Sequence, residues 1–345
     1  MKKINSSYLN HCSFIMNYKK INTVKKLSNF LNIDNEILKD ITGNNYNIII
    51  GNGYAEDILN NVLTVKKIEI RKKSGGLRIV YSPVSDNLTN CLKVLNSKLR
   101  HIYKPSSSVH GYIKGRGIKT NASEHLGKKY LLKIDIENYF EKITKESIIQ
   151  SLNNLGFHHE TSPLIARIVT HNDILVQGFH TSPTIANIIF NELDLRLSRF
   201  PNITYTRYAD DLYFSSEEEI DIIPKVEKQL LKFGFTINKP KTKLMKRGQK
   251  QYVTGLTVFD SSIPRISKNK KKEIRQLMHY IKIYGYKGHI MHKLKIKHQD
   301  YLNNEDTKKK VDYAIESLKR KTKGWLLFIN SIEPDFSSKY IDLKK

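Results

Sequence analysis

Near the start of the chain, apolar residues recur every three or four positions, which is the spacing of one face of an α-helix. The first such run contains Val24, Leu27 and Leu31. A second short run follows Asp34 and Asn35, and either residue is suited to cap a helix N-terminus. This pattern predicts a helical N-terminal arm over residues 1–60.

Two β-rich segments come next, Val65–Ile70 and Leu77–Tyr81. Between them lies the basic run 72–76, Lys-Lys-Ser-Gly-Gly, whose glycines favour a turn. The pattern predicts a β-hairpin with positive charge near its tip.

In the middle of the chain, expected strands alternate with amphipathic helices. Tyr130–Ile136 has the pattern of a strand, and Thr144 is suited to cap a helix that ends at Gly156. Ile203–Phe214 is typical of two strands joined by a turn, and another helix is expected over 223–233. We therefore predict an α+β fold in which helices cover one face of a small antiparallel sheet.

The C-terminal part is a basic helical region, with a boundary expected near Asp260. Ile274, Leu277, Met278 and Ile281 mark one face of a helix. The other side of this helix is basic and carries Lys271, Lys272, Arg275 and Lys282. Such a face either grips the backbone of a nucleic acid or is simply a solvated charged surface.

Charge narrows the choice of partner. Lys and Arg number 59 against 33 Asp and Glu, a formal net charge of +26 over 345 residues. A polyanion such as nucleic acid is the natural partner, because each neutralised phosphate releases a condensed counterion. A non-catalytic RNA-binding protein would share this charge. No apolar run approaches the ~20 residues that a membrane-spanning helix needs, so no membrane partner is expected.

Cys12 and Cys91 are the only cysteines, which excludes a disulfide framework and a Cys-rich zinc module. The charged N-terminus, Met1–Asn5, is not followed by an apolar region of secretory length. Both features lead us to expect a reducing, cytoplasmic location.

Three aspartates stand where predicted strands end. Asp135 lies near the end of the strand at 130–136, on the face opposite its apolar neighbours. Asp210 and Asp211 fall between two apolar β-runs, at the expected tip of a hairpin, where Asp tolerates turn geometry. Taken alone, an Asp-Asp pair in a turn is usually solvated surface or a cap.

Nucleotidyl transfer gives a reason to bring three acids together. One Mg²⁺ lowers the pKa of an attacking hydroxyl and a second, ~3.5–4 Å away, stabilises the leaving pyrophosphate, so the two ions need shared carboxylates. Without cations the clustered acids would repel one another and raise their own pKa values. We expect two Mg²⁺ ions, with Mn²⁺ as a possible substitute in vitro.

Further motifs carry a family resemblance. Tyr208-Ala209-Asp210-Asp211 resembles the tetrapeptide of reverse transcriptases, and Asp135 with its following aromatic resembles their first catalytic motif. Between them, the segment 177–183 matches the family's Gln-Gly-x-x-x-Ser-Pro, and Asn238–Thr242 resembles a later motif whose lysine approaches the triphosphate. The resemblance covers roughly residues 65 to 260.

Two elements are similar to those of the bacterial retron reverse transcriptases. Asn121 and His125 stand in an Asn-Ala-x-x-His element, and Val253-Thr254-Gly255 matches a Val-Thr-Gly element. A helix cap or a buried hydrogen-bonded pair is the alternative for the first. A strand that ends in a turn is the alternative for the second.

The resemblance implies a right-hand polymerase fold. Its parts would be the arm (1–60), fingers (61–130, with a further part around 145–185), a palm with the small antiparallel sheet and the catalytic acids (131–260), and a basic helical thumb (261–345). The implied catalytic and metal-binding residues are Asp135, Asp210 and Asp211.

The implied nucleotide-binding residues are Lys73, Arg78, Phe140, Gln177 and Lys241. Phe140 would lie beneath the sugar and exclude a 2′-hydroxyl, unless it is plain core, and Lys73 is equally suited to a solvated turn. RNA binding is implied for Asn121, His125, Val253, Thr254, Gly255, Lys271, Lys272 and Arg275. Phe179 departs from the small residue common at its position, which leaves the geometry of the nucleotide pocket open.

The implied function is that of a retron enzyme in the bacterial cytoplasm. It would use dNTPs to copy part of a cognate noncoding RNA into single-stranded DNA joined to that RNA (msDNA), primed by an RNA 2′-hydroxyl. A role in antiphage defence with a separate effector protein is also implied. Another antiphage or group II intron-like reverse transcriptase, with a different template and primer, remains the alternative.

Overall fold

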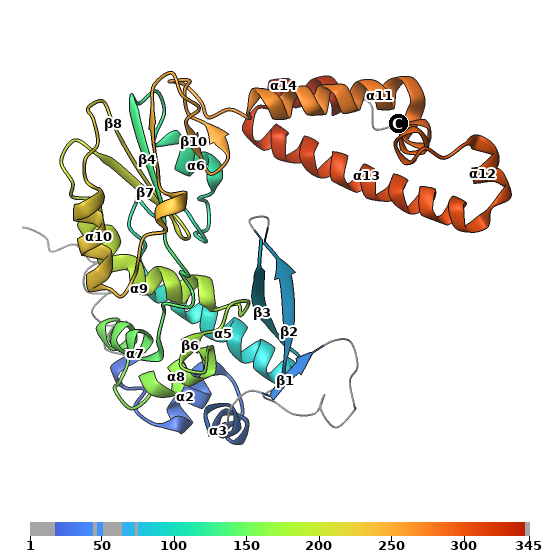
Figure 1. The fold of residues 1–345 in the computed structure, drawn as a ribbon. Coiled ribbons are helices and arrows are strands. Elements are labelled where there is room, and N and C mark those ends of the chain that lie inside the picture. Colours follow the sequence, from blue (N-terminus) through green and yellow to red (C-terminus); the bar gives the residue numbers. More distant parts are fainter. Residues whose placement is uncertain (1–17, 44–46, 51–63, 73–74, 342–345) are drawn as a thin grey trace, which may run out of the picture. The chain divides into compact units, whose positions relative to one another are not determined.

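The computed structural model describes residues 18–43, 47–50, 64–72 and 75–341 (Figure 1). By compactness the chain divides into two units. Unit 1 contains residues 1–115, 133–213 and 221–243, and unit 2 contains 116–132, 214–220 and 244–345. The segment 131–260, which we expect to be the palm, contributes to both units, and the division into fingers, palm and thumb stays a prediction.

Unit 1 begins with the expected helices. Helix α2 (Val24–Leu31) is capped by Thr23, whose hydroxyl accepts a hydrogen bond from the backbone N–H of Lys26 at 3.2 Å. Helix α3 (Asn35–Gly43) follows Asp34, whose carboxylate accepts from the backbone of Glu36 at 2.8 Å. The apolar stripes that predicted these helices are buried at Leu27, Leu31, Leu38 and Ile41.

The expected hairpin is present and belongs to a three-stranded sheet. Strands β2 (Thr64–Arg71) and β3 (Leu77–Pro83) pair antiparallel, with Arg71 opposite Leu77. Strand β1 (Asn47–Ile50) pairs with β2 in parallel and was not predicted. Figure 1 shows β2 and β3 extending beyond β1 toward the hairpin tip. Lys73, near that tip, lies outside the described residues.

Helices make up most of the rest of unit 1. Their bounds are α5 (Asp86–Ile102), α7 (Lys145–Asn154), α8 (Ser162–Val169), α9 (Ser182–Leu197) and α10 (Ile223–Lys232), with a 3₁₀ turn, η1, at Lys239–Lys241. Thr144 caps α7 as expected, and its hydroxyl accepts from Ser147 N at 3.3 Å. The short strands β5 (Thr170–His171) and β6 (Ile174–Leu175) form a hairpin.

The sheet that carries the expected catalytic strands has four members in the order β7-β8-β4-β9. Their bounds are β4 (Tyr130–Asp135), β7 (Thr204–Tyr208), β8 (Asp211–Ser216) and β9 (Lys243–Lys246). Strands β7 and β8 are joined by the two residues Ala209 and Asp210. Because β4 neighbours β8, the sheet order brings the end of β4 close to that turn.

Unit 2 contains the C-terminal helices and a small hairpin. The helices are α6 (Ile118–Ser123), α11 (Lys268–Leu294), α12 (His298–Asn303), α13 (Glu305–Ile332) and α14 (Pro334–Ile341), and the hairpin strands are β10 (Tyr252–Val253) and β11 (Leu256–Thr257). Figure 1 shows α11 and α13 running side by side and α12 between their far ends. Helix α11 is kinked at Gly285, whose φ is 68°.

The expected α+β fold class is confirmed by these helices and small sheets. Among the described residues, none of the helices is both long and apolar enough to cross a membrane.

Candidate active site

Unit 1 has a hollow of about 680 Å³ that is lined by residues of the β2-β3 hairpin, by the end of β4 and by the turn between β7 and β8. Most of the expected nucleotide-binding residues and two of the three expected acids face it. The lining includes Arg78, Tyr112, Asp135, Phe140, Gln177, Asp210 and Lys241. The tertiary structure therefore brings together residues that are more than 160 positions apart in sequence.

Asp135 is the last residue of β4, and its side chain is 8% exposed. Its backbone carbonyl accepts a hydrogen bond from the N–H of Asn238 at 2.8 Å. The ammonium group of Lys241 lies 3.2 and 3.3 Å from its two carboxylate oxygens. The motif at 238–242 is thus fixed to the strand end that carries the first acid.

Asp210 occupies the turn between β7 and β8. The preceding residue, Ala209, has a φ of 57°, in the left-handed region that a non-glycine residue adopts only at some cost. The carbonyl of Asp210 accepts from the N–H of Ile136 at 3.0 Å, which ties the turn to the end of β4. Burial raises the pKa of the Asp210 carboxyl, and the charges of Asp211 and Asp135 raise it further.

Asp211 begins β8 and does not line the hollow. One of its carboxylate oxygens lies 2.8 Å from the ammonium group of Lys133, and the other accepts from the hydroxyl of Tyr213 at 3.1 Å. The side chain of Lys133 also lies over the Tyr213 ring, at 5.8 Å. The sequence did not single out Lys133, although a lysine two residues before Asp135 on one strand faces the same way as that acid.

Carboxylate oxygens are the ligands that Mg²⁺ prefers, and Asp135 and Asp210 present them to the same hollow. As the side chains stand, no three His, Cys, Asp or Glu groups in the described part of the chain are close enough to hold a metal ion. Lys241 and Lys133 instead neutralise Asp135 and Asp211. The donor set fits divalent cations in charge and ligand type, because the mutual repulsion of the acids calls for positive charge.

The buried side chain of Arg207 stabilises the turn between β7 and β8. Arg207, on β7, is fully buried, and its guanidinium donates to both carboxylate oxygens of Asp194 on α9, at 2.9 and 2.7 Å. It also donates to the carbonyl of Ala209 at 3.2 Å and to Asn187 at 2.9 Å. Tyr205 donates its hydroxyl to the same Asp194 at 2.7 Å. Sequence reasoning missed this network, and its only local signal is an arginine beside the acid pair.

The two aromatic residues that follow Asp135, Tyr139 and Phe140, lie in different environments. Tyr139 is 4% exposed and packs among Phe190 and Phe235, with ring centroids 5.8 and 5.7 Å away. Phe140 is half-buried and faces the hollow. Tyr139 therefore fills the core, which leaves Phe140 available to a bound nucleotide.

The segment that begins at Gln177 lies against the hairpin. The carbonyl of Gln177 accepts from Tyr81 N at 2.8 Å. Gly178 has a φ of 112°, and a Cβ on it would collide with the Tyr81 carbonyl and with Val80. Phe179 is 2% exposed and does not line the hollow. The side chain of Phe179, which departs from the family pattern, is thus part of the core and lies outside the lining of this hollow.

The two retron-like elements lie together in unit 2. Helix α6, with Asn121, contacts the hairpin β10-β11, and the Thr254 hydroxyl donates to the carbonyl of Ile118 at 3.1 Å. Asn121, His125 and Val253 are fully buried, and His125 shares a 2.7 Å hydrogen bond with Ser215. As they stand, none of these three side chains is accessible for direct contact with RNA. For His125, a buried hydrogen-bonded role fits the structure.

Neither polar atom of the Asn121 side-chain amide has a hydrogen-bond partner among the residues that the structure describes, although the side chain is fully buried. It is therefore not the partner of His125. In the turn between β10 and β11, Thr254 and Gly255 have positive φ values of 48° and 84°, and Gly255 is exposed. The accessible groups of the two retron-like elements are therefore in this turn, which belongs to the Val-Thr-Gly element.

The three basic residues that we expect to bind RNA from the thumb, Lys271, Lys272 and Arg275, lie in different environments. Lys271 lies 2.9 Å from the carboxylate of Glu333, which is 7% exposed and also accepts from Ile266 N at 2.6 Å. Lys272 and Arg275 are exposed on α11 and form no ion pair within the described chain. Lys271 thus fastens α11 to the end of α13, and the other two cations face solvent. Trp325 is half-buried, with the Lys270 ammonium 3.8 Å from its ring.

A family model described as reverse transcriptase (RNA-dependent DNA polymerase) matches residues 70–281. The retron Ec86 reverse transcriptase of Escherichia coli is 31% identical over 239 residues, which cover 66% of this chain and 72% of that protein. The retron Mx65 reverse transcriptase of Myxococcus xanthus is 30% identical, and the match spans 61% of this chain but only 54% of that protein.

Among solved structures, apo telomerase from Candida tropicalis is similar, with a TM-score of 0.46 and 13% identity, over 88% of this chain and 62% of the other. Telomerase from Candida albicans in complex with a fragment of telomeric RNA gives a TM-score of 0.44 and 13% identity, over 81% and 56% of the two chains.

Proposed function

Because the chain belongs to the reverse transcriptase family and resembles retron enzymes within it, we propose that it is the RNA-directed DNA polymerase of a retron. It copies part of a cognate structured noncoding RNA into single-stranded DNA that stays joined to that RNA, with an RNA 2′-hydroxyl as primer. Its setting is antiphage defence, together with a separate effector protein. The observation that carries the catalytic part is that Asp135 and Asp210 face one hollow that also contains Lys241 and Arg78.

In this proposal Asp135, Asp210 and Asp211 hold two Mg²⁺ ions. When bound, these ions would activate the attacking hydroxyl and stabilise the leaving pyrophosphate. Lys241 is 54% exposed and holds Asp135 only through its flexible ammonium end, so it can turn to the triphosphate of an incoming nucleotide. Arg78, exposed on β3, supplies a planar guanidinium suited to phosphate oxygens.

The direct test is to purify the protein with its own RNA and to supply Mg²⁺ and dNTPs. We expect DNA synthesis that starts on the RNA and a product that remains covalently linked after protein removal. Sequencing across the junction identifies the primer. If the protein extends only a free primer, a group II intron-like enzyme is favoured. If it extends no primer at all, the alternative of a non-catalytic RNA-binding protein is favoured.

Replacing Phe140 with alanine should admit ribonucleotides. A ring that faces the hollow beneath the sugar collides with a 2′-hydroxyl, and its removal takes that obstacle away. The ratio of kcat/KM for an rNTP to that for the matching dNTP should rise by about tenfold or more, since 1–3 kcal/mol of discrimination is typical of such contacts. Phe179→Leu, a change in the core, serves as the control. An unchanged ratio in Phe140→Ala would place the gate elsewhere.

Lys272→Gln combined with Arg275→Gln should weaken binding of the cognate RNA. Both side chains are exposed on α11, so their loss should flatten the dependence of log K on log salt by about 0.7–0.9 for each phosphate contact removed. Lys20→Gln with Lys25→Gln removes the same charge from exposed positions at the other end of the chain. Equal effects of the two pairs would mean that only net charge matters.

A further inference from the structure

Asp211 is held by neighbouring side chains through both of its carboxylate oxygens. The Lys133 ammonium group lies 2.8 Å from Oδ1, and the hydroxyl of Tyr213 donates to Oδ2 at 3.1 Å. Asp211 and Tyr213 are two residues apart on β8, so their side chains share one face of the sheet. Lys133 comes from β4, the neighbouring strand. The three side chains therefore form one cluster across two strands.

This cluster is partly covered from solvent. The side chains of Lys133 and Asp211 are 29% and 23% exposed, and Tyr213 is 1% exposed. The Lys133 ammonium group lies 5.8 Å from the centre of the Tyr213 ring, close enough for a cation–π contact. Because it contacts a carboxylate and an aromatic ring at the same time, Lys133 is held more firmly than a solvated surface lysine.

The other two acids are held differently. Asp135 pairs with Lys241, whose side chain is 54% exposed and reaches the acid from the turn η1. Asp210 forms no ion pair with a lysine or arginine in the described part of the chain. Both acids line the hollow of about 680 Å³, and Asp211 does not. Asp211 is thus the acid whose neighbours keep its carboxylate out of the hollow.

The contacts of Asp211 bear on cation binding. To contribute a metal ligand, its carboxylate must exchange the ammonium group or the tyrosine hydroxyl for the cation. An ammonium group and a divalent cation compete for one carboxylate, because each is attracted by its negative charge and the two repel each other. Until that exchange, Lys133 neutralises Asp211 and so limits the repulsion among the three clustered acids.

We propose that Lys133 is a positioning residue that holds Asp211 away from the hollow and thereby weakens the binding of free divalent cations there. It releases Asp211 when a cation takes the place of its ammonium group. Tyr213 acts in the same direction through the second carboxylate oxygen. This inference rests on the proposed function, in which the three acids hold two Mg²⁺ ions.

The test is cation binding by the full chain, freed of nucleic acid. Mn²⁺ is added to the metal-free protein, and electron paramagnetic resonance measures the Mn²⁺ that remains free. Lys133→Met removes the ammonium group, Lys133→Arg keeps the positive charge, and Tyr213→Phe removes the hydroxyl without changing the charge. Thermal unfolding in the presence of EDTA checks that each variant is folded.

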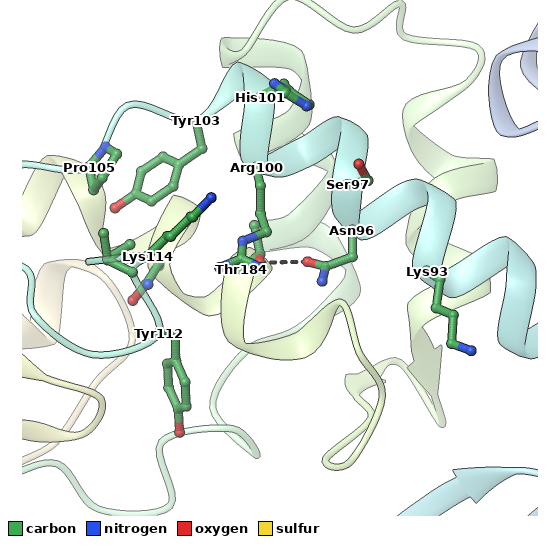
Figure 2. A pocket seen from close by; sticks show the side chains of 12 residues that line it. Lys93, Asn96, Ser97, Arg100, His101, Tyr103, Pro105, Tyr112, Lys114 and Thr184 are labelled. Carbon is green, nitrogen blue, oxygen red and sulfur yellow. Dashed lines mark hydrogen bonds between the residues drawn. The ribbon is translucent and has the colours of Figure 1, made fainter. Parts of the chain in front are cut away.

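Two other lysines provide the controls. Lys128 pairs with Glu217 at 3.5 Å, and its side chain is 33% exposed, close to the value for Lys133. Lys93 is exposed on α5 and lines a second hollow of unit 1, of about 570 Å³, with no acidic residue among the described residues that line it (Figure 2). Lys128→Met tests the loss of an ion pair of similar exposure, and Lys93→Met tests the loss of one positive charge.

We expect Lys133→Met to tighten Mn²⁺ binding by about tenfold, because the cation no longer has to displace an ammonium group. Tyr213→Phe should tighten it by about threefold, since one hydrogen bond to Asp211 is lost. Lys133→Arg and the two controls should bind Mn²⁺ much as the parent protein does. The Mg²⁺ concentration that gives half-maximal primer extension should fall in Lys133→Met. Mg²⁺ should also raise its unfolding temperature by more than that of the parent.

Unchanged or weaker Mn²⁺ binding by a folded Lys133→Met protein would overturn the assignment. Equal tightening in Lys93→Met would also overturn it, because net charge alone would then explain the effect. A parent-like Tyr213→Phe would do the same, because the position of Asp211 would then not matter. If the parent protein extends no primer but the Mn²⁺ results are as expected, the proposed function fails and the role of Lys133 stands.

Discussion

Asp210→Asn is expected to abolish DNA synthesis while leaving RNA affinity nearly unchanged. The amide keeps the size of the carboxylate but cannot supply its charge, and it leaves Asp135 as the only aspartate among the described residues that line the hollow at the strand ends. Loss of one transition-state contact typically lowers the rate about 10²–10³-fold, and removal of a metal ligand should lower it at least that far. RNA affinity is spread over many cations and should persist.

The measurement is single-turnover primer extension with Mg²⁺, beside RNA binding by the same preparation. Asp221→Asn is the control, because Asp221 is exposed and outside the lining of the hollow. Substantial extension by a folded Asp210→Asn protein would contradict the assignment of the catalytic acids. A parallel loss of RNA binding would point to misfolding, which circular dichroism can detect.

Arg207→Met should destabilise the protein by about 3–5 kcal/mol, because it leaves the carboxylate of Asp194 buried without its cation. Both side chains of this ion pair are 0% exposed. Burial opposes the charge of Arg207, but Asp194 raises the pKa of the guanidinium well above its usual value, so Arg207 stays charged at any working pH. The variant should also lose activity, since the donor to the Ala209 carbonyl is gone.

The urea midpoint of unfolding measures the first effect. Arg196→Met is the matched control, because Arg196 pairs with Glu192 at the surface, 44% and 58% exposed, and such pairs contribute about 0–1 kcal/mol. Arg207→Met/Asp194→Leu should recover much of the stability, since no buried charge is then left alone. A single variant as stable as Arg196→Met would show that the network does not hold the turn.

The fold class and many of the helices and strands could be predicted from the sequence. Apolar residues at a period of two predicted the hairpin β2-β3, and apolar residues at a period of 3.6 predicted helices such as α7. Cap residues such as Thr144 indicated where helices begin. The α+β class with a right-hand polymerase fold agrees with the match to the reverse transcriptase family. The three candidate acids could be placed at strand ends because the pattern around them is local.

The sequence by itself therefore determined many of the helices and strands, the net positive charge that predicts a polyanionic partner, and the positions of Asp135, Asp210 and Asp211 along the chain. Only the tertiary structure decided which charges meet: Lys241 with Asp135, Lys133 with Asp211, and Arg207 with Asp194. It also decided that Phe140 faces the hollow while Phe179 is buried, and that Asn121 and His125 are covered. The reason is physical. The residues next to a basic or aromatic side chain in sequence do not indicate which side chain it will contact. Its burial is set by strand order and helix packing between segments far apart in the chain.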